Sequence, residues 1–93
     1  MNEVPLFSSL NIKSITLRNR IVLSPMCQYK ARDGIISDWH LQHYSRFAFS
    51  GLGAAFVEAT GVTPGGRIGH GCTGIWSDDH IEGLSKIAKT FKE

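Results

Sequence analysis

Cysteine and proline are scarce in this sequence, and neither sign of charge dominates it. The two cysteines, Cys27 and Cys72, lie far apart among 93 residues. A disulfide scaffold or a zinc site built on cysteine pairs is therefore not expected, and we predict two free thiols. The 10 Lys and Arg residues and 8 Asp and Glu residues are spread along the chain and give a net charge of +2. Because no basic run could follow a phosphate backbone, we expect no nucleic-acid partner.

Long hydrophobic runs are also absent. No apolar stretch approaches the roughly 20 residues that a helix needs to cross a bilayer, and residues 1–5 lack the charged and apolar blocks of a signal peptide. We therefore expect no membrane partner and a cytoplasmic location. The hydrophobic content of 42% and the aromatic content of 10% are ordinary for a globular protein, so the chain should fold around a core.

Short apolar segments predict the strands. Residues 10–12 and 15–17 flank a polar pair and predict a small hairpin. Residues 21–24 and 54–59 form two continuous apolar runs, which are typical of parallel strands covered on both faces. The chain should therefore contain part of a parallel sheet.

Two amphipathic segments predict helices. Ser37 or Asp38 can cap a helix that ends near Gly51, and a second helix should begin near Ser77. The expected inward residues are Leu41, Tyr44, Phe47 and Ala48 in the first helix, and Ile81, Leu84, Ile87, Ala88 and Phe91 in the second. The order is hairpin, strand, helix, strand, helix, which indicates an α/β fold.

This order leaves the fold incomplete. Two parallel strands with their helices have open edges and an uncovered apolar face, which a small domain does not tolerate easily. We therefore interpret the chain as a fragment of a larger α/β domain.

Candidate chemistry gathers just beyond the first apolar run, at Ser24, Pro25, Met26, Cys27 and Tyr29. The carboxyl ends of buried strands are where α/β proteins place their sites. The thiol could hydrogen-bond a ligand, and the phenol could donate a hydrogen bond while its ring stacks on a flat ligand. Taken singly, such a cysteine is more often a small core residue and such a tyrosine usually only packs.

A glycine motif lies further along the chain. Gly69, Gly71 and Gly74 match the dinucleotide fingerprint G-x-G-x-x-G. That fingerprint follows a strand directly and opens a helix, whereas residues 75–77 intervene here before the expected helix, so we interpret the match as coincidence. The alternative is a non-catalytic remnant, or a small nucleotide-binding or partner-binding module, that uses this loop.

The histidines do not predict a metal site. His40 and His43 are three residues apart on the first helix but have no clear third or fourth ligand, so we expect packing or capping roles and no metal. His70 and His80 are expected to be solvated.

Two further charges have open roles. Glu58 is the only charge in the second apolar run and needs a partner, either an ion pair with Arg46 or Arg20, which we favour, or a ligand in a site. Arg67 could contact a phosphate or a carboxylate, although a loop arginine is commonly only a surface charge.

Several segments together resemble a known family. They are LRNRIVLSPMCQY (residues 17–29), DWHLQHY (38–44), VEATGVTPGGRI (57–68) and GIWSDDHIEG (74–83). Through them the chain resembles the amino-terminal part of the Old Yellow Enzyme family, the flavin-dependent ene-reductases also described as NADPH dehydrogenases. The resemblance extends over nearly all of residues 6–93.

The resemblance implies a (β/α)8 TIM barrel, a fold that typically needs about 250 residues. Residues 1–93 would be the incomplete amino-terminal portion of a single FMN-binding barrel domain. Residues 21–24 would form barrel strand one and residues 54–59 strand two, and the hairpin would close the barrel floor.

The resemblance also implies roles for the candidate residues. Residues 24–27 match the segment that lines FMN, and Ala59 matches a small residue against the flavin. Cys27 resembles a cysteine that tunes the redox behaviour of the flavin, and Tyr29 resembles a tyrosine that contacts substrate. The loop at residues 69–74 and the short loop after Tyr29 depart from the family pattern, which bears on substrate preference.

The implied reaction takes hydride from NAD(P)H through FMN to the C=C bond of an α,β-unsaturated carbonyl compound, an enone or enal. The full-length protein would be a homo-oligomer. Since the remaining site groups in the family come from later strands, we expect this segment to be inactive alone.

Overall fold

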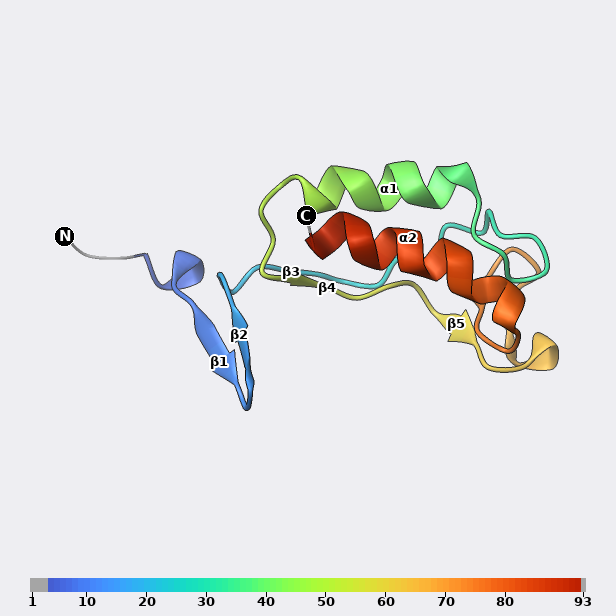
Figure 1. Cartoon of the computed structure of the whole chain (residues 1–93), viewed down its shortest axis with the longest axis horizontal. Helices are drawn as coiled ribbons and strands as arrows, with labels where there is room; N and C mark the ends of the chain where they lie inside the picture. Colours follow the sequence, from blue (N-terminus) through green and yellow to red (C-terminus); the bar gives the residue numbers. More distant parts are fainter. Residues whose placement is uncertain (1–3, 93) are drawn as a thin grey trace.

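The computed structural model describes residues 4–92, and it is elongated. Its extents are 51 × 26 × 20 Å and its radius of gyration is 15.0 Å, compared with about 13 Å for a compact domain of 100 residues. The amino-terminal hairpin projects away from the body formed by the two helices and the strands (Figure 1).

The hairpin is present as predicted. Strand β1 (Leu10–Ile12) pairs antiparallel with β2 (Ile15–Leu17), after a short 3-10 helix, η1 (Pro5–Phe7). Arg20 ties the hairpin to the chain that precedes it, because its backbone N–H donates to the Leu6 carbonyl at 3.0 Å and its Nε donates to Ser8 Oγ at 3.1 Å.

The predicted strand, helix, strand unit is confirmed. Strand β3 (Val22–Leu23) lies parallel to β4 (Ala54–Ala55), and helix α1 (Asp38–Ala48) connects them. The prediction of a strand over residues 54–59 was too long. The ladder stops after Phe56 N–H donates to the Leu23 carbonyl at 3.0 Å, because the next donor on the neighbouring chain would be Pro25, which has no N–H.

A second parallel pair was not predicted. Strand β5 (Thr60–Gly61) pairs with β6 (Thr73–Gly74), and the 3-10 helix η2 (Pro64–Gly66) lies between them in the chain. The hydroxyls of Thr60 and Thr73 are hydrogen-bonded at 2.9 Å. Two Thr-Gly pairs in a glycine-rich stretch carry no strand periodicity, so the sequence pattern could not reveal them.

Both helices begin with the same capping interaction, between a serine backbone N–H and a histidine ring nitrogen three residues later. Ser37 N–H donates to His40 Nδ1 at 3.0 Å at the start of α1, and Ser77 N–H donates to His80 Nδ1 at 3.2 Å at the 3-10 helix η3 (Asp78–His80) that leads into α2 (Ile81–Lys92). The predicted capping role of His40 is therefore confirmed.

The prediction of a solvated His80 was wrong. Only 4% of its surface is exposed, and its Nε2 donates to the Asp33 carbonyl at 2.9 Å. His70 is exposed as expected. Among residues 4–92 no helix has both the length and the apolar character needed to span a membrane.

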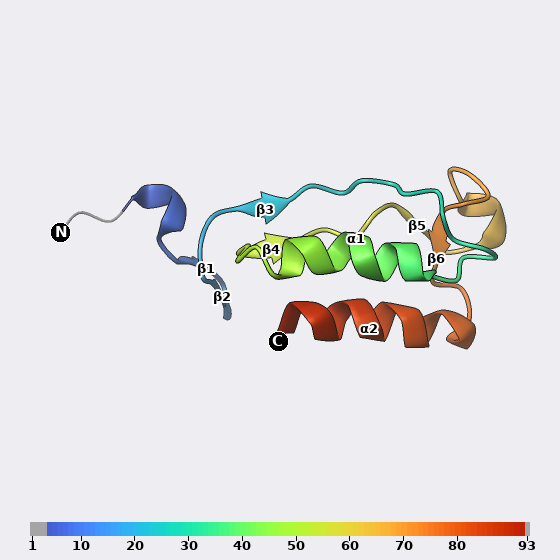
Figure 2. The same ribbon diagram turned by 90° about the horizontal axis from the view of Figure 1, so that it is seen from above.

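The core lies where the helices meet the β3 and β4 strands. The helices α1 and α2 run side by side in both views (Figures 1 and 2). Leu23, Tyr44 and Ile87 are the buried centre. The partly buried residues around it are Ile36, Leu41, Phe47, Leu52, Ala55 and Phe91.

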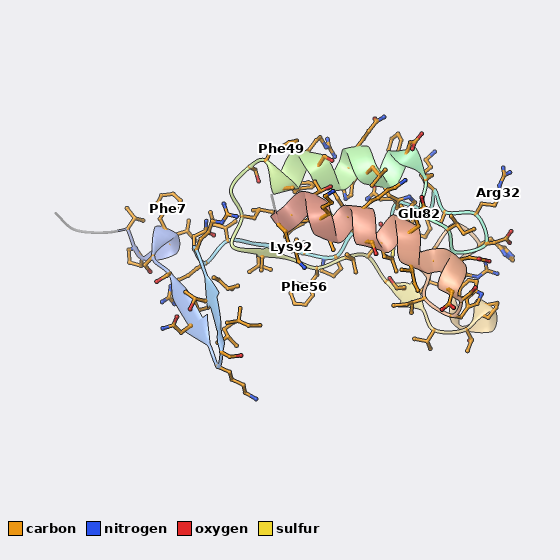
Figure 3. All side chains as sticks on the ribbon, in the orientation of Figure 1. Phe7, Arg32, Phe49, Phe56, Glu82 and Lys92 are labelled. Atoms are coloured by element: carbon orange, nitrogen blue, oxygen red, sulfur yellow. The ribbon has the colours of Figure 1, made fainter. Side chains whose placement is uncertain are left out.

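Part of the apolar surface remains uncovered in the described chain. Phe56 is 62% exposed and projects from the strands away from the helices (Figure 3). Ile81 and Ala88 were expected to face inward, but Ile81 is 58% exposed and Ala88 is also exposed. The part of α2 that carries Ile81 and Ala88 stays exposed in the described residues, because neither α1 nor the pair of β3 and β4 covers it.

A buried polar clamp joins α1 to the chain beyond β4. Glu58 is only 2% exposed; its Oε2 accepts from the Tyr44 hydroxyl at 2.9 Å, and its backbone N–H donates to the same hydroxyl oxygen at 2.9 Å. Burial raises the pKa of the Tyr44 phenol well above its ordinary value, so the hydroxyl keeps the proton that it donates.

His40 completes this clamp. Since Nδ1 accepts a backbone N–H, the ring proton of neutral His40 is on Nε2, which lies 3.3 Å from Glu58 Oε1 without the geometry of a full hydrogen bond. The predicted ion pair of Glu58 with Arg46 or Arg20 was wrong: Arg46 contacts His43 Nδ1 at 3.3 Å, and Arg20 bonds within the hairpin region. The partner of the Glu58 carboxylate is the uncharged hydroxyl of Tyr44 on α1. A search for opposite charges along the sequence could not reveal this partner.

We expect Tyr44→Phe to lower the free energy of unfolding by about 1–3 kcal/mol, because the substitution leaves a buried carboxylate oxygen and a backbone N–H without their partner. Urea unfolding of the larger domain that contains this chain, followed by tryptophan fluorescence, measures this. The matched control is Tyr29→Phe, since Tyr29 is 59% exposed and should change stability by less than about 0.5 kcal/mol. Equal stability of Tyr44→Phe and the unchanged chain would contradict the clamp.

Candidate active site

The parallel pairing brings two chain segments to one edge. Residues 24–29 continue from β3 and residues 56–59 continue from β4, so both emerge at the carboxyl ends of neighbouring strands. Beyond the last ladder bond, the Gln28 N–H lies 3.5 Å from Glu58 Oε1, which keeps the two segments adjacent. The structure therefore places the predicted residues 24–27 and Tyr29 on one segment and Ala59 on its neighbour, at the same edge.

The predicted site residues at this edge, apart from Tyr29, have small or polarisable side chains and carry no formal charge. Ser24, Pro25, Met26 and Ala59 are exposed, and Cys27 is half-buried with a free thiol. Such a surface offers apolar contact together with a hydroxyl and a thiol as weak donors. It is suited to a flat, largely apolar ligand with polar atoms at its edge.

Tyr29 supplies a phenol next to that surface. Electrostatic interaction with Cys27 is the main reason that the pKa of the Tyr29 hydroxyl is raised above its ordinary value. The phenol is protonated at neutral pH, as a free tyrosine is, and can donate a hydrogen bond. Its backbone has φ of 57°, in the left-handed region that residues other than glycine seldom adopt.

Gln28 and Trp39 anchor this segment, and sequence reasoning missed both. Trp39 Nε1 donates to Gln28 Oε1 at 2.9 Å, and Gln28 Nε2 donates to the Met26 carbonyl at 3.0 Å. The Lys30 ammonium lies 5.1 Å from the centre of the Trp39 ring. The position of Gln28 between Cys27 and Tyr29 could have indicated a role in this segment. Its partner Trp39 lies 11 residues further along the chain, and only the fold brings the two side chains together.

The glycine motif does not form a helix-opening nucleotide loop. Gly74 belongs to β6, and the 3-10 helix η3 starts only at Asp78. Gly71 instead lies against the backbone of Tyr29, and its carbonyl accepts from Ala31 N–H at 2.9 Å. This geometry agrees with the interpretation of the fingerprint match as coincidence.

Arg67 folds back on its own loop. Its Nε donates to the Pro64 carbonyl at 2.9 Å, and its guanidinium lies 5.4 Å from the centre of the Trp76 ring. These contacts give Arg67 a local packing role, which was not among the roles left open by the sequence.

The described residues do not assemble a metal centre. Within residues 4–92 no group of three or more His, Cys, Asp or Glu side chains is placed to hold a metal ion. His43 packs edge-on against Tyr44 and Phe47, with ring centres 4.8 and 5.2 Å away.

Sequence comparison finds relatives that match almost the whole chain. Residues 5–93 match the profile of the NADH:flavin oxidoreductase / NADH oxidase family. The NADPH dehydrogenase of Geobacillus thermodenitrificans is 50% identical over 95 residues, which cover 100% of this chain and 28% of that protein. The NADPH dehydrogenase of Bacillus subtilis is 47% identical over 90 residues, covering 95% of this chain and 27% of that protein.

Solved structures give the same result for the fold. The Old Yellow Enzyme homologue of Zymomonas mobilis superimposes with a TM-score of 0.85 at 28% identity, over 96% of this chain and 25% of that one. The Old Yellow Enzyme of Trypanosoma cruzi gives a TM-score of 0.84 at 30% identity, over 95% of this chain and 24% of that one.

The chain thus spans about a quarter of the length of these relatives. Their fold is the (β/α)8 barrel, so the described strands and helices are part of such a barrel and do not form a closed one. With its profile match from residue 5 to residue 93 and its strand, helix, strand unit in the same arrangement, this chain belongs to the NADH:flavin oxidoreductase / NADH oxidase family.

Proposed function

We propose that this chain forms one side of the FMN site of an NAD(P)H-dependent ene-reductase, as the amino-terminal part of a single barrel domain. The observation that carries the proposal is the shared edge at which residues 24–27 and Ala59 leave two neighbouring parallel strands. The family match supports FMN as the cofactor and NADPH as the co-substrate.

The residues at this edge fit the flavin. Residues 24–27 and Ala59 would hold it, because their uncharged and mostly exposed side chains suit a planar ring system. A larger or charged side chain in place of Ala59 would protrude from that surface and obstruct the ring system. When bound, FMN supplies the hydride carrier between the two substrates, while the protein supplies binding, orientation and electrostatics.

Cys27 has the chemistry to tune the redox potential. Its thiol is a weak donor and is half-buried beside Tyr29. A hydrogen bond from the thiol to the polar edge of the ring strengthens as negative charge develops there, so it favours the reduced cofactor.

Tyr29 is proposed to bind the second substrate. Its protonated phenol is 59% exposed and can donate to the oxygen of a carbonyl compound. In the proposed reaction NADPH loses hydride to become NADP+, and an enone or enal gains hydride at its β-carbon and a proton at its α-carbon. The resemblance to Old Yellow Enzymes supports this substrate class and a homo-oligomeric complete protein.

A chimera tests the function. We expect this chain to bind FMN and to oxidise NADPH with 2-cyclohexenone when it replaces the aligned segment of the Geobacillus thermodenitrificans NADPH dehydrogenase. FMN absorbance after gel filtration and NADPH consumption measure the two properties. A chimera that folds but retains no flavin would contradict the proposed function.

The 93-residue chain alone should neither bind micromolar FMN nor reduce the enone, because a (β/α)8 core requires the rest of the ring. Fluorescence titration of FMN with the purified chain measures binding. Saturable binding together with enone reduction would refute this expectation.

In the chimera, Cys27→Ala should lower the FMN reduction potential by roughly 10–30 mV, the equivalent of one lost hydrogen bond in a two-electron couple. Spectroelectrochemical titration measures the shift. Cys72→Ala is the matched control, since it removes the other thiol, which is buried beside Gly69. A potential that is the same in all three proteins would contradict the role of Cys27.

A further inference from the structure

The turn at residues 69–72 lies directly against Tyr29. A Cβ on Gly71 would stand 2.5 Å from the Tyr29 carbonyl oxygen, 2.6 Å from its carbonyl carbon and 2.8 Å from its Cα. Carbon atoms of a side chain do not approach backbone this closely, so a side chain at position 71 would force the two segments apart.

Gly71 is not required by its own backbone angles. The glycines with positive φ in residues 4–92 are Gly34 and Gly51, and Gly71 is not among them. Alanine could therefore adopt the local conformation. What demands glycine at position 71 is the close approach of Tyr29.

Tyr29 needs such a support. Its φ of 57° is sparsely populated for a residue with a side chain and persists only where the surroundings hold it. The support is visible in the hydrogen bond from Ala31 N–H to the Gly71 carbonyl, 2.9 Å long, which fixes the chain just after Tyr29.

The same turn touches the ring of Tyr29. A Cβ on Gly69 would lie 3.9 Å from ring atoms Cδ1 and Cε1, at ordinary contact distance. The turn is closed by Cys72, whose N–H donates to the Gly69 carbonyl at 3.1 Å and whose Sγ accepts from Gly69 N–H at 3.3 Å. Cys72 is 1% exposed, so it anchors the turn in the interior.

We propose that the turn at residues 69–72 is a positioning element for Tyr29, and that Gly71 sets the direction of the phenol and thereby the fit of the carbonyl substrate. This inference rests on the proposed function, because it assigns the turn a role through the residue that binds substrate. Gly71 is a positioning residue and does not itself touch the substrate.

Three glycines provide a graded test in the chimera. Gly71→Ala inserts a methyl group at 2.5 Å from Tyr29 and Gly69→Ala inserts one at 3.9 Å, whereas a Cβ on Gly65 meets nothing within 4 Å. We expect kcat/KM for 2-cyclohexenone to fall about 10- to 100-fold in Gly71→Ala, to change by less than about twofold in Gly69→Ala, where the methyl group stands at ordinary contact distance, and to stay unchanged in Gly65→Ala. FMN content should be equal in all of them.

A double-mutant cycle separates positioning from general damage. In a Tyr29→Ala background, Gly71→Ala should change kcat/KM by less than about twofold, because the residue through which it acts is gone. An equal loss in both backgrounds would overturn the proposal. So would a Gly71→Ala variant that is as active as the parent.

A readout independent of turnover uses the phenol itself. In protein labelled at tyrosine Cζ with 13C, the Tyr29 signal is assigned by its loss in Tyr29→Phe. Interaction with Cys27 raises the pKa of the Tyr29 phenol, so displacing Tyr29 relative to Cys27 should change this pKa in Gly71→Ala and not in Gly65→Ala. An unmoved pKa would overturn the proposal.

Failure of the proposed function is a separate outcome, since the unsubstituted chimera would then lack flavin before any glycine is changed. If Gly71→Ala does not fold, Gly69→Leu carries the same comparison in both backgrounds, because a side chain longer than a methyl group would press on the Tyr29 ring, which a Cβ at position 69 already contacts at 3.9 Å. Unchanged kcat/KM and an unchanged Tyr29 pKa in Gly69→Leu would then refute the proposal.

Discussion

The parallel pairing of Val22 and Leu23 with Ala54 and Ala55 is the contact on which the rest of the structure depends. A parallel pair needs a crossover between its strands, and α1 supplies it. The pairing also sends both chains out at the same edge, which is why side chains from two distant segments meet there. In a different register, the Cys27 thiol and Ala59 would not share one surface.

The edge is held by polar groups buried behind it. Tyr44 bonds both the side chain and the backbone of Glu58, and the Glu58 carboxylate faces the Gln28 N–H. Glu58 precedes Ala59, and Gln28 stands between Cys27 and Tyr29. A single carboxylate thus connects α1 to both segments of the candidate site. A buried network of this kind is costly when incomplete, so it restricts the positions that the segments can take.

Sequence reasoning succeeded where a local pattern had a direct physical cause. The start of the first helix at Ser37 or Asp38 and that of the second near Ser77 were predictable because capping needs a partner within three residues. The apolar runs predicted a parallel pair because such strands are covered on both faces. It failed where the partner was distant. The proton acceptor for His80 is the Asp33 carbonyl, 47 residues away, and the hydroxyl partner of Glu58 comes from the middle of α1.

The sequence by itself determined the order hairpin, strand, helix, strand, helix, the family resemblance and the placement of Ser24 to Tyr29 beyond a buried strand, because these follow from hydrophobic periodicity and from motifs within short stretches of chain. Only the tertiary structure decided that Gly71 lies against Tyr29, that Thr60 pairs with Thr73, and that Tyr44 holds Glu58. Each of these depends on a distance between residues separated by more than ten positions, and such distances are fixed by packing of the whole fold and not by the local sequence.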